Sequence, residues 1–156
     1  MKIKVIALGK IKEKFLKDGI DEFIKRLKPY TSIEIIELNP IEIKDDNLIK
    51  KTLELEAEKI LSNIKQDSYV ITLEIQGKQL SSEDFAQKIN EITISGTSEL
   101  IFVIGSSCGI AQSVSQRANF KLSFSKMTFL HQFARLILVE QIYRAFKILK
   151  NETYHK

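Results

Sequence analysis

Apolar and polar positions along this 156-residue chain form two alternating patterns. Short apolar runs, with partial apolar–polar alternation in the second, predict five β-strands, over residues 3–8, 33–38, 69–73, 100–104 and 122–124. Apolar residues spaced three or four apart predict helices, over residues 12–27, 47–64, 81–92, 110–117 and 132–150. Regular alternation of strands and helices predicts an α/β fold with a mostly parallel five-stranded sheet and flanking helices, in a single domain over residues 1–156.

The last predicted helix is apolar on nearly every side at Leu136-Ile137-Leu138-Val139. A helix of this kind has to be covered on more than one side. In so short a chain, the pattern indicates a subunit interface.

The composition narrows the class of protein. No apolar run approaches the ~18 residues of a membrane-spanning helix, and the first residues are patterned like a strand rather than a signal peptide. The single cysteine, Cys108, cannot form an internal disulfide. His and Cys are not clustered at metal-ligand spacing. We therefore expect a cytoplasmic protein with no membrane segment and no metal.

The charge is distributed unevenly. Residues 1–99 hold 16 Lys/Arg and 18 Asp/Glu, whereas residues 100–156 hold 8 Lys/Arg and only 2 Asp/Glu. A basic C-terminal third suits a polyanion such as nucleic acid, because phosphates favour clustered cations. The alternative is that these charges serve only solubility.

Three segments follow predicted strands, where parallel sheets usually bind ligands. They are residues 73–78, 105–109 and 124–131. The run Phe124-Ser125-Lys126-Met127-Thr128-Phe129 contains neither Gly nor Pro, although it joins a strand to a helix. We expect this run and the Gly-bearing turn at 105–109 to form a cofactor pocket.

The turn Gly105-Ser106-Ser107-Cys108-Gly109 matches the G-x-S-x-G nucleophile elbow of serine hydrolases. A hydrolase triad also needs an acid and then a histidine after the serine. No Asp or Glu lies between Ser107 and His131, and those before His155 fall in the last helix region. Cys108 likewise lacks a positioned base, so we reject hydrolysis.

The C-terminal residues Tyr154-His155-Lys156 combine an aromatic ring, an imidazole and an ammonium group. A chain end normally frays. These three groups together could stack on a nucleobase and form hydrogen bonds with it.

Seven short motifs, each present once, follow one another along the chain. They are Leu8-Gly9-Lys10, Leu73-Glu74-Ile75-Gln76-Gly77-Lys78, Phe102-Val103-Ile104-Gly105 with Gly109, Leu122-Ser123 through Thr128, His131 with Arg135, Glu140 with Tyr143-Arg144-Ala145, and Tyr154-His155-Lys156. In this order and spacing, the chain resembles the SPOUT class of RNA methyltransferases. It looks most like the type that methylates N3 of a pseudouridine in 23S ribosomal RNA (the RlmH type).

This resemblance implies a homodimer, a C-terminal trefoil knot and S-adenosyl-L-methionine as the cofactor. The implied cofactor contacts are Leu73, Gly105, Phe124, Ser125, Lys126, Met127, Thr128 and Phe129. The implied contacts with 23S rRNA in the ribosome are His131, Arg135, Arg144, Tyr154, His155 and Lys156. The implied catalytic residues are His155, Tyr154 and Arg135.

The resemblance also suggests roles for these residues. His155 can take up a proton near neutral pH, while Arg135 and Lys156 suit a phosphate or the N3 anion. In a dimer, the tail could serve the cofactor pocket of the partner.

Two positions depart from the family pattern. Ser106 stands where the family has a second glycine, which would cost about 1 kcal/mol if the backbone φ there were positive. Leu130 replaces a proline, so we expect a more flexible loop before binding. The alternative function is therefore a divergent, non-catalytic RNA-binding SPOUT homodimer.

Overall fold

Five parallel strands form the central sheet of the computed structural model, which describes residues 1–156. The strands are β1 (Lys2–Leu8), β2 (Ser32–Leu38), β3 (Tyr69–Gln79), β4 (Glu99–Ile104) and β5 (Phe120–Ser123), in the spatial order β2-β1-β4-β3-β5. Every neighbouring pair is parallel. The predicted α/β fold is confirmed, and the sheet is wholly rather than mostly parallel. The trefoil knot stays a prediction.

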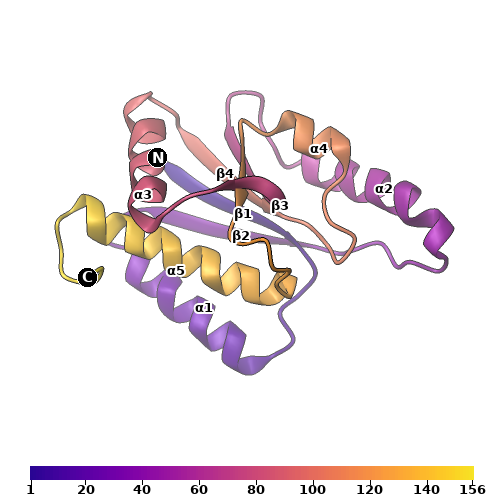
Figure 1. Ribbon diagram of the computed structural model, residues 1–156, viewed down its shortest axis with the longest axis horizontal. Helices are drawn as coiled ribbons and strands as arrows, with labels where there is room; N and C mark the ends of the chain where they lie inside the picture. The colour runs from indigo at the N-terminus through magenta and orange to yellow at the C-terminus, as the bar shows by residue number, and fades with distance from the viewer.

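Helices cover both faces of the sheet (Figure 1). The helices α1 (Lys14–Leu27), α3 (Ser82–Ile94) and α5 (His131–Leu149) share one apolar core with one face. The helices α2 (Ile49–Leu61) and α4 (Gln112–Arg117) share a second core with the other face. The central strand β4 is buried at every residue because both of its faces are covered.

Most element boundaries differ from the sequence prediction by one or two residues, and the differences that affect the site or the helix length concern α2, β3 and β5. The helix predicted over 47–64 is a 3₁₀ turn at Asp46–Leu48 followed by α2, which ends at Leu61. Beyond that end, the Ser62 hydroxyl and the Asn63 amide bond to the backbone oxygen of Lys59. Such side-chain bonds to the backbone compete with continued helix.

The strand β3 extends to Gln79 instead of ending at Leu73, because the pairing with β5 resumes at Lys78 after an interruption. The strand β5 ends at Ser123, so Phe124 lies outside it. There the Ser123 hydroxyl donates to the backbone oxygen of Ser125, at 3.0 Å, and the chain turns out of the sheet. Both changes shape the edge of the sheet where the candidate site lies.

No helix combines the length and the apolar composition that crossing a bilayer would require.

Candidate functional site

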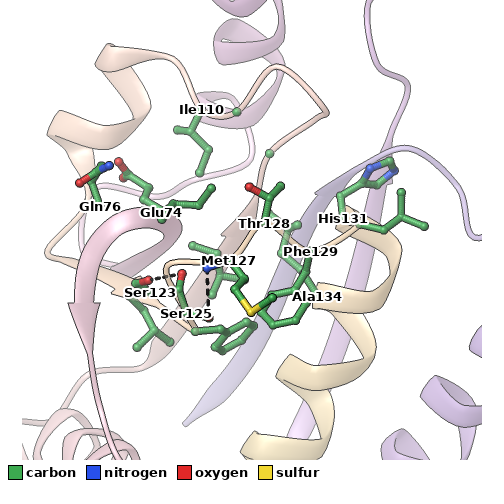
Figure 2. Close-up of a pocket in the computed structure, with 18 of the residues that line it drawn as sticks. Glu74, Gln76, Ile110, Ser123, Ser125, Met127, Thr128, Phe129, His131 and Ala134 are labelled. Atoms are coloured by element: carbon green, nitrogen blue, oxygen red, sulfur yellow. Dashed lines mark hydrogen bonds between the residues drawn. The ribbon is translucent and has the colours of Figure 1, made fainter.

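A cavity of about 610 Å³ lies beside a bulge of β3 and the carboxyl ends of β4 and β5, next to the start of α5. This volume is typical of small-molecule sites, which span roughly 300–1,000 Å³. Half of the 20 residues that line it are hydrophobic. The cavity therefore lies where the strand order predicts a ligand, and Figure 2 shows its lining.

The first wall is a bulge of β3. Leu73 and Lys78 both pair with Leu122 of β5, so residues 74–77 loop out of the sheet toward the cavity. A side chain at Gly77 would place its Cβ 2.7 Å from the backbone oxygen of Lys121. Glycine is therefore required for this bulge to lie against β5.

The second wall is the turn after β4. A Cβ at Gly105 would lie 2.3 Å from the backbone oxygen of Gly109, and Gly109 itself has a φ of +88°. The Gly109 N–H donates to the Ser106 oxygen at 2.9 Å, which closes the turn. Both glycines are needed for this turn to fold back so tightly.

Ser106, which replaces a family glycine, is not strained. The only non-glycine residue with positive φ is Asn151. The Ser106 hydroxyl donates to Glu56 Oε2 at 2.9 Å, while Glu56 Oε1 accepts the Ile41 N–H at 3.2 Å. Glu56 is only 2% exposed, so the serine satisfies a buried carboxylate and ties this turn to α2.

The third wall is the segment between β5 and α5. The Met127 N–H donates to the Ser125 hydroxyl at 3.0 Å, which holds the segment in a turn (Figure 2). Of the eight predicted cofactor residues, seven line the cavity: Leu73, Gly105, Phe124, Ser125, Met127, Thr128 and Phe129. The eighth, Lys126, is exposed and is not among the lining residues.

Glu74 lines the cavity as well, and sequence reasoning did not select it. Its Oε1 accepts the Thr72 hydroxyl at 2.6 Å and its Oε2 accepts the Ser115 hydroxyl at 3.0 Å. Glu74 and Gln76 both follow the predicted strand 69–73. That position was the sequence signal that could have identified both as cavity residues.

His131 also lines the cavity, although it was predicted as an RNA contact. It is the first residue of α5 and lies close to Gly9, where a Cβ would be 3.5 Å from its Nε2. Burial, and then the nearby charge of Arg135, lower the pKa of His131 below its ordinary value. This environment therefore favours the neutral imidazole over the charged form.

Arg135 lies one turn further along α5 and is buried, with 1% of its surface exposed. Its guanidinium pairs with Glu37 Oε2 at 2.7 Å and donates to the Gly9 oxygen at 2.9 Å. These contacts join α5 to the ends of β1 and β2. The predicted contact with RNA stays a prediction.

The C-terminal tail is held against its own chain. Tyr154 donates to Glu140 Oε1 at 3.0 Å, and its ring packs edge-on against Tyr143. Burial, and then the bond to Glu140, raise the pKa of Tyr154, so its hydroxyl stays protonated. Arg144 pairs with the same carboxylate at 2.6 Å and lies over the Tyr154 ring.

His155 is fixed through both ring nitrogens. Its Nε2 lies 2.7 Å from Glu83 Oε1, and its Nδ1 lies 3.2 Å from Arg144 Nη1. Because arginine can only donate, Nδ1 accepts and Nε2 carries the proton. The bond with His155 in turn lowers the pKa of Glu83.

The structure thus brings seven of the eight predicted cofactor residues together but keeps the tail apart from them. Neither Tyr154, His155 nor Lys156 lines the cavity. Arg144, which touches Tyr154 and His155, follows His131 by 13 residues, about 20 Å along α5 at 1.5 Å per residue.

No group of three or more His, Cys, Asp or Glu side chains is placed to hold a metal ion.

Comparisons with known proteins show the family. The family model described as "Predicted SPOUT methyltransferase" matches residues 1–155. Two full-length relatives, from Methanococcus maripaludis and Methanococcus vannielii, are 52% and 50% identical. Each match covers 100% of both chains, and both relatives carry the name "Putative ribosomal RNA large subunit methyltransferase H".

A solved structure from Haemophilus influenzae, titled as a probable methylase family protein, is similar in fold. It superposes with a TM-score of 0.51 at 14% identity, over 96% of this chain and 66% of that one. At so low an identity, the likeness concerns the fold alone.

Proposed function

The chain belongs to the SPOUT methyltransferase family, and we propose that it methylates ribosomal RNA with S-adenosyl-L-methionine as the methyl donor. The substrate we infer is N3 of a pseudouridine in 23S rRNA of the large ribosomal subunit. The cavity beside the β3 bulge and the ends of β4 and β5 carries this proposal, because it unites seven of the eight residues expected around the cofactor.

The lining residues suit this cofactor. Side chains such as Leu73, Ile110 and Phe129 offer apolar contact for an adenine, and backbone groups of the two turns that line the cavity suit hydrogen bonds to it. Glu74 supplies a negative charge for a cationic ligand. When bound, S-adenosyl-L-methionine supplies a methyl group that its positive sulfur makes electrophilic.

The chain's own task is then to position the nucleobase and accept its proton. Alignment of reacting groups can contribute an effective molarity of roughly 10⁵ M or more. His155 is our candidate base, with Nδ1 as the atom that accepts the proton. Because Nδ1 accepts from Arg144 here, proton uptake requires Arg144 to move, for example onto an RNA phosphate. Tyr154 acts as a hydrogen-bond donor and stacking surface, since its hydroxyl stays protonated.

We also propose that two copies form the working enzyme. Phe15 and Phe133 are 61% and 41% exposed, with ring centroids 6.0 Å apart. Leu130 and Met127, at the cavity mouth, are 56% and 73% exposed. Exposed apolar groups of this kind beside a cavity mark interaction surfaces. A second copy on this surface could bring its own tail to the cavity.

Transfer of a labelled methyl group to ribosomes from a methylation-deficient strain tests the activity. Label on one pseudouridine of the large-subunit RNA is the expected result. Titration of S-adenosyl-L-methionine by calorimetry separates the catalytic function from a non-catalytic RNA-binding homodimer, which predicts no saturable heat.

A mixing experiment tests the shared site. One variant, Gly105→Ala, disturbs the cofactor turn, and a second, Tyr154→Ala with His155→Ala, removes the tail groups. Each homodimer should be inactive. Mixed dimers should regain activity at one site if the tail acts on the partner's cavity, and none if it acts within its own chain. Unchanged activity of the tail variant would contradict its assignment to the substrate site.

A further inference from the structure

Glu74 is the only Asp, Glu, Lys or Arg side chain among the residues that line the cavity. Two hydroxyl groups hold its carboxylate, one on each oxygen. Thr72, fully buried on β3, donates to Oε1 at 2.6 Å, and Ser115 of α4 donates to Oε2 at 3.0 Å. A carboxylate has about four acceptor sites, so both oxygens can still interact with a ligand. The position of this charge is therefore fixed before a ligand arrives.

The charge lies at one side of the cavity. In Figure 2, Glu74 stands beside Gln76, and the neutral His131 lies on the opposite side of the view, with Met127, Thr128 and Phe129 between them. Much of the remaining lining is apolar. Partial enclosure by apolar side chains lowers the effective dielectric constant, so a charge interacts more strongly with a ligand in such a cavity than in water.

The methyl donor and its product differ by one charge. The sulfur of S-adenosyl-L-methionine is a cation, and departure of the methyl group leaves the electron pair of the broken bond on a neutral thioether, S-adenosylhomocysteine. The new bond forms from the lone pair of N3, whose proton passes to the base. A fixed carboxylate attracts the cation and gains nothing from the thioether.

We propose that Glu74 faces this sulfur and selects the charged methyl donor over its neutral product. This inference rests on the proposed function and adds a specificity-determining residue to it. Selection of this kind lets the cavity fill with donor and release the spent product after each turnover.

The same placement has a kinetic consequence. The positive charge on sulfur fades as the methyl group leaves, so an interaction with Glu74 is stronger in the ground state than in the transition state. Its removal should raise KM for the donor without lowering kcat. A residue that served only to keep the cavity folded would lower kcat as well.

Calorimetric titration of S-adenosyl-L-methionine and S-adenosylhomocysteine, on the wild type and on Glu74→Gln, tests the proposal. We expect Glu74→Gln to weaken binding of the methyl donor about tenfold or more and to leave binding of the product within about twofold, since only the donor loses a charge pair. Glu58→Gln, an equal charge change at an exposed residue of α2, is the matched control and should alter neither affinity. Thermal melting confirms that each variant is folded.

The outcomes separate the two proposals. Equal weakening of donor and product in Glu74→Gln would mean that Glu74 binds a part common to both, such as the ribose, and would overturn the inference alone. No saturable heat for the donor with the wild type would overturn the proposed function, and the inference with it. Loss of both affinities through unfolding is recognised from the melting curve; in that case wild-type titrations at rising salt concentration decide. A charge pair weakens with salt, so donor affinity must fall with salt while product affinity stays within about twofold, and equal salt dependence of the two would overturn the inference.

Discussion

Replacement of Arg135 by methionine tests whether this residue stabilises the fold or serves RNA. The guanidinium forms an ion pair with Glu37 and donates to the Gly9 oxygen, at 2.7 and 2.9 Å. Glu37 Oε2 also accepts the Ile11 N–H at 3.2 Å. Arg135 therefore connects the start of α5 to the segment after β1 and to the end of β2.

The expected loss follows from these contacts. A hydrogen bond to a charged group contributes about 1.5–3 kcal/mol. Two features reduce the sum here: Glu37 is 38% exposed, and the buried Arg135 Nε has no partner. We expect Arg135→Met to lower the free energy of unfolding by about 2–3 kcal/mol, which corresponds to about 4–12 °C in Tm for a domain of this size.

Urea unfolding measures this loss, through the midpoint at unchanged slope. Protein concentration must be held equal, because dimer formation itself raises apparent stability. Glu37→Gln, which keeps a hydrogen-bond acceptor, should cost less, about 1 kcal/mol. If Arg135→Met unfolds at the wild-type midpoint yet no longer methylates RNA, the reasoning from its buried contacts is wrong and the side chain serves the reaction directly.

Three further predictions concern the cavity and its mouth. Leu130 has a φ of −56°, within the range of proline, and its N–H bonds to no protein atom. Leu130→Pro should therefore raise the free energy of unfolding by about 0.4–1 kcal/mol, measured by urea unfolding. Destabilisation would show that the backbone before residue 130 cannot accept proline. Because the pKa of His131 is lowered in the folded state, the unfolded chain binds more protons, and stability should fall as the pH drops below about 6.5. Substitution His131→Gln should remove that part of the pH dependence, and an unchanged profile would assign it to other groups. Phe15→Ser with Phe133→Ser should shift sedimentation from dimer to monomer, and an intact dimer would place the interface elsewhere.

Most of the fold was predictable because the strands contain short apolar or alternating segments between helical patterns. The strands β1 and β4 are mostly apolar because helices cover both faces of the sheet, so their burial can be predicted from the sequence. The second half of β3 is mostly polar, so no apolar pattern predicted it. It follows a bulge at residues 74–77 that only the pairing with β5 reveals.

The candidate site was predictable in part for a similar reason. Segments after strands gather at one edge of a parallel sheet, so seven of the predicted cofactor residues meet in one cavity. Lys126 shares the segment, but its side chain is exposed. Position in a loop does not fix the direction of a side chain. Glu56 bonds to Ser106, 50 positions further along the chain, and Glu74 bonds to Ser115, 41 positions further along. No local sequence pattern predicts contacts between residues so far apart.

The separation between cavity and tail bears on how many copies the reaction needs. Within one chain, Tyr154 and His155 are held by Glu140, Arg144 and Glu83, and none of these residues lines the cavity. The tail would have to release all of those bonds to reach its own cavity, whereas a second copy could dock its folded tail at the cavity first, with only the Arg144–His155 bond released during the reaction. The exposed apolar groups at the cavity mouth offer that copy a place to dock. We therefore expect loss of the dimer to abolish methyl transfer while cofactor binding persists, because the cavity is complete within one chain and the substrate site is not.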